Sequence, residues 1–119
     1  MNRSTFPKTI RLRRKAEFDA VFDGKLFAAD DVLVMHSQKN QLDFTRLGLS
    51  IGKKVGNAVV RNRWKRLIRE SFRRQQHDLP TGLDLVIRPR KGGDCELKKI
   101  SRSINGLANR LARKLGQAP

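Results

Sequence analysis

The first apolar positions of the chain recur with the period of a helix. In residues 15–23, Phe18, Val21 and Phe22 lie three and four positions apart, so one helical face carries all three side chains. Gly24 follows directly, and glycine commonly ends a helix. The pattern therefore predicts a short amphipathic helix whose apolar face is largely aromatic.

The next segments follow the period of strands. Residues 32–37 form a short apolar run, and residues 44–51 alternate between small or polar side chains and aliphatic ones. The loop 38–43 is long enough to join the two segments, which predicts an antiparallel hairpin. A weaker, short strand is expected near 25–29.

Two long helices are expected in the second half of the chain. Residues 58–77 carry an apolar stripe at helical spacing and follow Asn57, a suitable N-cap. The stripe consists of Val60, Trp64, Leu67, Ile68, Ser71 and Phe72. Residues 83–88 predict one more strand, and residues 95–115 predict a last helix that Asp94 can cap.

The predicted order of elements is α-β-β-β-α-β-α. This order indicates an α+β fold in which three helices pack against one small sheet. No repeat or linker divides the 119 residues, so residues 9–119 are expected to form a single domain. Residues 1–8, with Pro7 near their end, are expected to be a flexible basic tail.

Composition adds a strong functional signal, which is an excess of positive charge. Lys and Arg number 27 against 11 Asp and Glu, so the formal net charge is +16. Self-repulsion at this level destabilises a compact chain, so a polyanionic partner is expected, with RNA, DNA and an anionic membrane surface as candidates. No apolar run approaches the roughly 20 residues of a membrane-spanning helix. The polar N-terminus and the lone Cys95 indicate a cytoplasmic protein without an internal disulfide.

The positive charge is concentrated on the helix predicted at 58–77. Four basic residues are spaced by four and form one ridge opposite the apolar stripe: Arg61, Lys65, Arg69 and Arg73. Asn62 and Arg66 project beside this ridge, and Glu70 is the only acid between positions 53 and 74. Because acids that could form intrahelical pairs are almost absent, the ridge is better suited to phosphate groups than to solvent.

Catalytic chemistry is not indicated by any pattern in the chain. Lys53 and Lys54 precede the predicted helix, where backbone N–H groups favour phosphate, but the spacing of a nucleotide-hydrolysing loop is missing. No Ser/His/Asp set, no suitably spaced pair of carboxylates and no zinc-ligand spacing occurs. The chain is therefore not expected to be a catalyst by itself.

Phe18 and Phe22 leave two interpretations open. Aromatic residues spaced by four usually pack in a core, but a partly exposed pair can stack on unpaired bases. Basic residues just upstream, such as Arg11 and Arg13, favour the second interpretation because they can add phosphate contacts. His36, a lone histidine in a strand, is more often a structural residue than a ligand.

Residues 48–70 contain a longer motif. They read Gly-Leu-Ser-Ile-Gly-Lys-Lys-Val-Gly-Asn-Ala-Val-Val-Arg-Asn-Arg-Trp-Lys-Arg-Leu-Ile-Arg-Glu. This segment resembles the signature of the bacterial ribonuclease P protein family, with Arg61-Asn62-Arg63 and Lys65-Arg66-Leu67 at its centre. The similarity extends upstream through Arg11-Leu12-Arg13, Phe18 and Phe22, and the order of elements agrees along nearly the whole chain.

The resemblance implies both a fold and a function. The fold is a four-stranded sheet with a left-handed βαβ crossover, although such crossovers are right-handed in about 98% of proteins. The function is that of the protein subunit of a cytoplasmic ribonucleoprotein, an endoribonuclease that removes the 5′ leader of precursor tRNA. The RNA subunit would perform catalysis and hold most of the required Mg²⁺. The partners would be the catalytic RNA and precursor tRNA, and neither DNA nor a membrane.

Carried onto this chain, the resemblance assigns two main sets of residues. The catalytic RNA would be bound by Arg61, Asn62, Arg63, Lys65, Arg66 and Arg69. The leader would lie in a cleft lined by Phe18, Phe22, His36, Lys53 and Lys54. Additional phosphate contacts would come from Arg11, Arg13, Arg14 and Arg73. Trp64 lies on the apolar stripe and is not assigned to RNA.

Two other functions share part of this pattern. A general RNA-binding or ribosome-associated protein without an enzymatic role would have the same charge and the same basic ridge. A DNA-binding module would place the helix at 58–77 in the major groove, but no helix-turn-helix spacing accompanies that helix.

Overall fold

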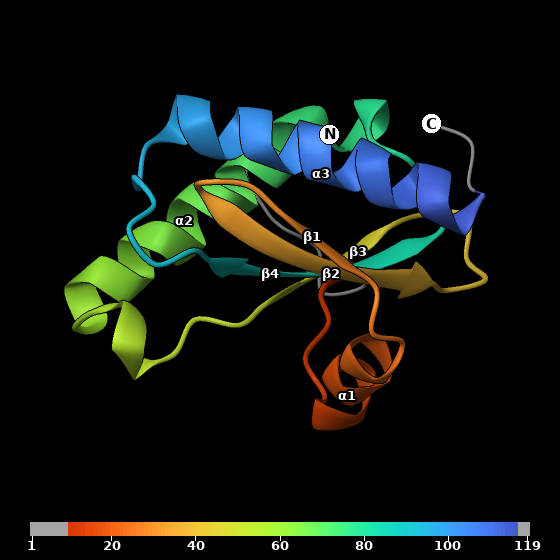
Figure 1. The fold of residues 1–119 in the computed structure, drawn as a ribbon, viewed down its shortest axis with the longest axis horizontal. Coiled ribbons are helices and arrows are strands. Elements are labelled where there is room, and N and C mark those ends of the chain that lie inside the picture. Colours follow the sequence, from red (N-terminus) through yellow and green to blue (C-terminus); the bar gives the residue numbers. More distant parts are fainter. Residues whose placement is uncertain (1–9, 117–119) are drawn as a thin grey trace, which may run out of the picture.

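The sheet separates one helix from the other two. The computed structural model describes residues 10–116, so the predicted tail, residues 1–8, lies outside the described residues. The elements are α1 (Lys15–Asp23), β1 (Phe27–Ala29), β2 (Leu33–Lys39), β3 (Arg46–Leu49), α2 (Ala58–Gln75), β4 (Leu83–Pro89) and α3 (Leu97–Leu115). Figure 1 shows α1 on one face of the sheet and α3 on the other, where α3 packs with α2. The predicted α+β class and order of elements are confirmed.

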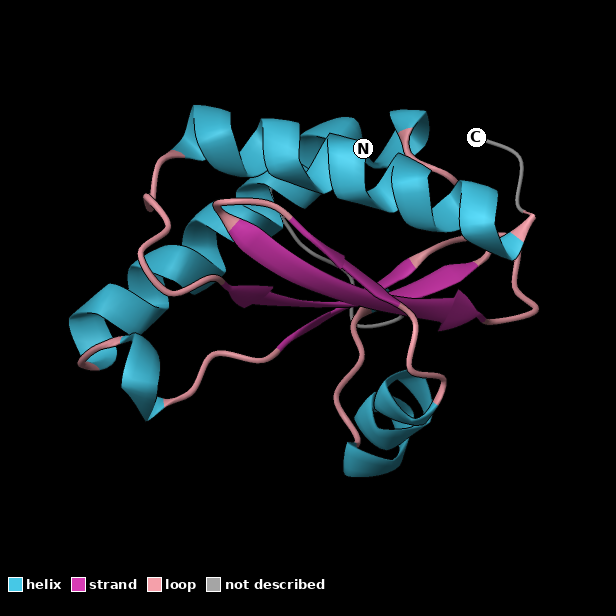
Figure 2. Ribbon diagram, viewed as in Figure 1, coloured by secondary structure: helices cyan, strands magenta, loops and turns pink. Residues whose placement is uncertain are grey.

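The strand order is β1-β2-β4-β3. Strand β4 runs antiparallel to β2 and parallel to β3, so β3, α2 and β4 form a βαβ unit. The predicted hairpin between residues 32–37 and 44–51 is wrong, because β4 lies between β2 and β3 and pairs with both. All of β4 except Arg88 is buried. Helices cover both faces of the sheet (Figure 2), so the most continuously apolar strand takes an inner position.

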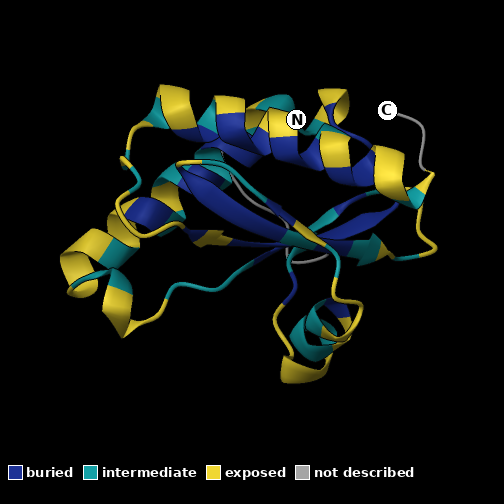
Figure 3. Cartoon of the chain, in the orientation of Figure 1, coloured by how far each residue is buried: buried dark blue, intermediate teal, exposed yellow. Residues whose placement is uncertain are grey.

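The larger core lies between the sheet and the helices α2 and α3. Alternate side chains of β2 and β4, such as Met35 and Ile87, meet the apolar faces of both helices. The fully buried side chains of α3 include Ile100, Ile104, Leu107 and Leu111. In Figure 3 the side of α3 that faces the sheet is dark blue and its outer side is mostly yellow. The predicted stripe of α2 is confirmed at Trp64, Ile68, Ser71 and Phe72, which are all buried.

Helix boundaries confirm one predicted cap and contradict another. Asn57 caps α2, since its Oδ1 accepts the N–H of Val60 at 3.0 Å. Val60 itself is 39% exposed, which contradicts its predicted place in the core, because its side chain lies against the turn at Gly56. Asp94 does not cap α3: its carboxylate pairs with Lys99, and the helix begins at Leu97. The predicted helix 58–77 ends at Gln75 and continues as a 3₁₀ turn, Gln76–Asp78.

A smaller core holds α1 on the opposite face of the sheet. Leu12, Val21 and Val86 are buried there, and Phe18 and Phe22 pack against them while remaining partly exposed. Gly48 makes this contact possible, because a Cβ at that position would lie 2.9 Å from Cζ of Phe18. The face that carries α1 is therefore only partly covered, unlike the face that carries α2 and α3.

Two glycine substitutions are expected to change stability in opposite directions. Gly48→Ala should destabilise the protein by about 1–3 kcal/mol, because the new methyl group would overlap the Phe18 ring. Gly106→Ala should stabilise it by about 0.5–1 kcal/mol, because Gly106 lies inside α3 with open space around it. Urea unfolding at constant sulfate concentration, followed by circular dichroism, measures both changes. A neutral Gly48→Ala would show that α1 packs loosely on β3.

Candidate functional site

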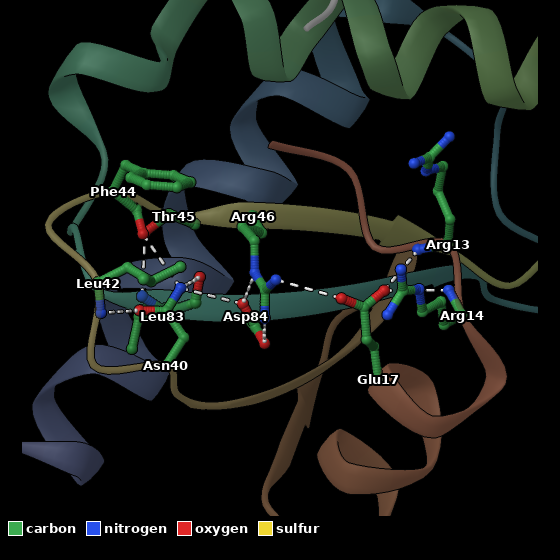
Figure 4. A network of polar contacts seen from close by, with 10 residues as sticks. All are labelled: Arg13, Arg14, Glu17, Asn40, Leu42, Phe44, Thr45, Arg46, Leu83 and Asp84. Atoms are coloured by element: carbon green, nitrogen blue, oxygen red, sulfur yellow. Dashed lines mark hydrogen bonds and ion pairs between the residues drawn. The ribbon is translucent and has the colours of Figure 1, made fainter. Parts of the chain in front are cut away.

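An ion-pair network holds α1 against the sheet, as Figure 4 shows. Arg46 on β3 donates two hydrogen bonds of 2.8 Å to Asp84 on β4, whose side chain is 4% exposed. Nη1 of Arg46 also donates to Oε2 of Glu17 on α1 at 3.2 Å. The other oxygen of Glu17 accepts the N–H groups of Arg13 and Arg14, each at 3.0 Å. One guanidinium group therefore joins β3, β4 and the first turn of α1.

The loop before β3 is tied to the same carboxylate. Nδ2 of Asn40 donates to Oδ1 of Asp84 and to the carbonyl oxygens of Phe44 and Leu83, each at 3.0 Å. These bonds bring the segment after β2 across the end of β4. They explain how residues 38–45 lead around β4 to its far side, where β3 pairs.

The strand register arranges the α1 face of the sheet in rows. One row across the four strands consists of Phe27, His36, Val86 and Gly48. Helix α1 crosses above this row: Phe18 covers Gly48, and Phe22 meets His36 edge-on, with ring centroids 4.8 Å apart. The partly exposed rings of α1 and the ring of His36 therefore lie on one border of the sheet surface.

The next row forms the floor beside α1, in which Val34 is buried. Ala29, Val34 and Arg88 face the same side as His36, and Arg88 is exposed. Ser50 follows β3 and shares a hollow of about 880 Å³ with Arg88. The same hollow is lined by Lys53, Lys54, Arg90 and Lys91, among others. The two predicted lysines thus lie at the end of the floor, away from the aromatic border.

His36 lies between two phenyl rings. Its centroid is 4.8 Å from that of Phe22 and 5.5 Å from that of Phe27. Both ring nitrogens are buried, and within residues 10–116 neither has a hydrogen-bond partner. Burial, helped by the charge of Arg88, lowers the pKa of the His36 imidazole. The surroundings of His36 therefore favour its uncharged form, an aromatic ring beside Phe22.

The residues before α1 lie between the aromatic border and α2. Arg11 forms a parallel bridge with Leu47, and Leu12 N–H donates to the Leu47 carbonyl at 2.8 Å, so this segment extends the sheet beyond β3. A second hollow, of about 300 Å³, lies at this edge. Its lining includes Arg11, Arg13, Phe18, Lys65 and Arg69. Phe18 therefore stands where the aromatic border and the basic face of α2 meet.

The basic residues of α2 differ in how accessible they are. Asn62, Arg63 and Arg66 are exposed, whereas Arg61, Lys65 and Arg69 are half-buried. Burial, together with the nearby charge of Arg11, lowers the pKa of the Arg69 guanidinium. Arg73 pairs with Glu70 at 2.8 Å, and Arg74 pairs with the same carboxylate. The densest unpaired charge therefore lies in the first three turns of α2, before Glu70.

Phe27 and Arg88 belong to this surface but were missed by sequence reasoning. Phe27 is 53% exposed, and only the pairing of β1 with β2 shows that it stands beside His36. Arg88 ends an apolar run, and the alternation of Asp84, Val86 and Arg88 with aliphatic residues was the signal that could have placed it.

The acidic residues near these surfaces do not fit a metal site. Glu17 and Asp84 pair with Arg46, and Glu70 pairs with Arg73. In the described part of the chain, no three His, Cys, Asp or Glu residues come together as metal ligands. None of the helices between residues 10 and 116 has the length and apolar character needed to span a membrane.

Known proteins resemble this chain in sequence and in structure. Residues 6–112 match the family model of ribonuclease P. A ribonuclease P protein component of Brevibacillus brevis is 46% identical over 112 residues, which cover 92% of this chain and 87% of the relative. The RNase P protein of Staphylococcus aureus superposes with a TM-score of 0.74 at 29% identity, over 91% of this chain and 99% of that one. The RNase P protein of Thermotoga maritima gives a TM-score of 0.74 at 31% identity, over 84% and 96% of the two chains.

Removal of Arg46 is expected to be the most damaging change in the network. Arg46→Met should destabilise the protein by about 3–5 kcal/mol, because the buried carboxylate of Asp84 would lose its charged partner and keep only the hydrogen bond from Asn40. Glu17→Gln should cost only about 1 kcal/mol, since the amide oxygen can still accept the N–H groups of Arg13 and Arg14. Urea unfolding of both variants tests this order. Equal losses would show that Asp84 does not depend on Arg46.

The contribution of Glu17 is expected to disappear in acid. Hydrogen bonds from the N–H groups of Arg14 and Arg13, and then the charge of Arg46, lower the pKa of Glu17 below its ordinary 4.5. A carboxyl group with a lowered folded pKa stabilises the protein above its unfolded pKa, and this stabilisation is lost as pH falls through the folded value. The difference in unfolding free energy between wild type and Glu17→Gln should therefore shrink below pH 4.5. A difference that stays constant into more acidic buffer would contradict this assignment.

Proposed function

The chain belongs to the bacterial ribonuclease P protein family, and from this premise we propose how its two surfaces act in the enzyme. Ribonuclease P removes the 5′ leader of precursor tRNA, and this chain is its accessory protein subunit, with catalysis performed by the RNA subunit. The basic face of α2 binds the catalytic RNA, and the cleft beside α1 binds the leader. We place this activity in the cytoplasm.

The α2 face contacts the folded catalytic RNA through six side chains in its first three turns. They are Arg61, Asn62, Arg63, Lys65, Arg66 and Arg69. Arginine holds phosphate oxygens in a two-pronged contact, and neutralisation of phosphates gives an affinity that falls as salt is added. Arg73 contributes less, because Glu70 already neutralises it.

The cleft binds the leader as a flexible single strand. The observation that carries this proposal is the aromatic border beside the floor with its exposed Arg88. Phe18 and Phe22 remain partly exposed there, whereas a purely structural pair would be buried. Exposed rings stack on any base, so this contact does not require a particular leader sequence. Phosphates between the bases are neutralised by Arg88 on the floor and by Lys53 and Lys54 at its end.

The protein promotes cleavage without taking part in it. Phe18 borders the hollow that also contains Lys65 and Arg69, so bound leader and bound catalytic RNA meet at this edge. Binding of the leader holds the precursor against the RNA subunit through contacts remote from the scissile bond. The positive charge of the protein reduces repulsion between RNA phosphates, which favours the Mg²⁺ that the RNA subunit holds.

The assignment is tested by cleavage of precursor tRNA by a bacterial ribonuclease P RNA at low Mg²⁺, with and without this protein. We expect the protein to restore cleavage at the mature 5′ end, because its charge and its contacts replace part of the role of Mg²⁺. The same protein, denatured by heat, serves as the negative control and should not restore cleavage. RNA binding without any gain in cleavage would instead indicate a general RNA-binding or ribosome-associated protein.

The two surfaces are expected to respond differently to substitution. Phe22→Ala should weaken binding of precursor tRNA by the holoenzyme about 5- to 100-fold, as loss of one stacked base predicts, and only for substrates with a leader. Arg66→Ala should weaken assembly with the catalytic RNA whatever the leader length. It should also lower the slope of log affinity against log salt concentration by about 1, which corresponds to one lost phosphate contact. Equilibrium binding and single-turnover cleavage measure these effects. If the protein helps a one-nucleotide leader as much as a long one, the cleft assignment fails.

A further inference from the structure

Phe27 presents an aromatic ring at the β1 edge of the sheet, beyond the part of the cleft that α1 borders. Its side chain is 53% exposed, although it belongs to a strand. Single exposed apolar side chains are common on proteins, and Leu42 and Val59 are examples in this chain. Phe27 differs from these two because its ring belongs to a group of rings.

Three rings from three elements form this group. Phe27 stands opposite His36 in the pairing of β1 with β2, with ring planes 35° apart and centroids separated by 5.5 Å. His36 in turn meets Phe22 of α1 nearly at a right angle, at 77°. The aromatic border of the cleft therefore continues past α1 and ends in the exposed ring of Phe27.

The ring behind Phe27 is held in place by packing. Among the described residues neither nitrogen of His36 has a hydrogen-bond partner, and both are buried, so contacts with its neighbours determine the position of the imidazole. Val86, which is fully buried, lies next to His36 in the same row of the sheet. A fixed ring behind Phe27 limits the movement of the Phe27 side chain, so less conformational entropy is lost when a ligand stacks on Phe27.

Positive charge accompanies the rings along the floor. Arg88 stands one row from His36, close enough for its charge to act on the imidazole. A strand that crosses the floor toward β1 therefore passes an exposed guanidinium before it reaches Phe27. This combination of a cation for phosphate and a flat ring for a base is the usual arrangement for binding an unpaired nucleotide.

We propose that Phe27, backed by His36, is an additional stacking site for one unpaired nucleobase of the RNA strand in the cleft. The proposal rests on the proposed function, because it assumes that a leader occupies the cleft. A strand reaches Phe27 only if it is long enough to pass Phe18 and Phe22, so the site acts on longer leaders. Stacking recognises the flat face of a base, so purines bind more strongly than pyrimidines but no base is excluded.

The test uses holoenzyme reconstituted with a bacterial ribonuclease P RNA and precursor tRNAs whose leaders grow by one nucleotide at a time. Wild type is compared with Phe27→Ala, and Leu42→Ala is the matched control because Leu42 is exposed in a loop away from the rings. We expect Phe27→Ala to lower the affinity for long leaders at least about fivefold. The loss should first appear at the leader length whose last added nucleotide reaches Phe27. Short leaders and the Leu42→Ala variant should be unaffected, and a purine at the critical position should bind more tightly than a pyrimidine.

Two further variants separate stacking from folding. Phe27→Leu keeps an apolar side chain without a flat ring and should lose affinity as Phe27→Ala does, whereas Phe27→Trp should restore it. A loss of equal size at every leader length, or no loss at any length, would overturn the stacking site while the cleft assignment stands. If the affinity of the wild type itself does not depend on leader length, the cleft assignment fails, and the stacking site fails with it.

Discussion

The partly buried guanidinium group of Arg46 makes the contact on which the shape of the cleft depends. It satisfies the carboxylate of Asp84, which is almost inaccessible to water, and it reaches Glu17 at the start of α1. The apolar contact beneath α1 is small, with three buried side chains and two partly exposed phenylalanines. Because so little apolar surface is buried there, the polar network has a large share in orienting α1. The positions of Phe18 and Phe22 depend on that orientation.

The two faces of the sheet serve different purposes. On one face, α2 and α3 bury the apolar sides of the strands and supply most of the stability of the fold. On the other face, α1 covers only part of the sheet and leaves Arg88 exposed on the floor, one row from His36. A sheet that was covered equally on both faces would be more stable but would offer no cleft. In the proposed function, this incomplete cover leaves room for the leader strand.

The high net charge of +16 is distributed over connected surfaces. The first three turns of α2, the segment before α1 and the floor of the cleft meet around Phe18 and around the hollow at Lys53 and Lys54. Acids close to these surfaces are paired with arginines, so they do not interrupt the positive potential. Such a surface suits an RNA that is folded on one side and single-stranded on the other. It fits the role of an accessory subunit that binds RNA.

The sequence by itself determined the helices, the strands and the basic face of α2, because these depend on side-chain period and charge along one continuous segment. It also placed Phe18 and Phe22 on one face of α1. The pairing of strands was decided only in the tertiary structure, where burial of β4 on both faces inserted it between β2 and β3 and excluded the expected hairpin. That pairing brought Phe27 beside His36 and aligned Arg88 with the floor. Contacts between segments distant in the chain leave no periodic signal in the sequence, so these residues could be found only from the register of the folded sheet.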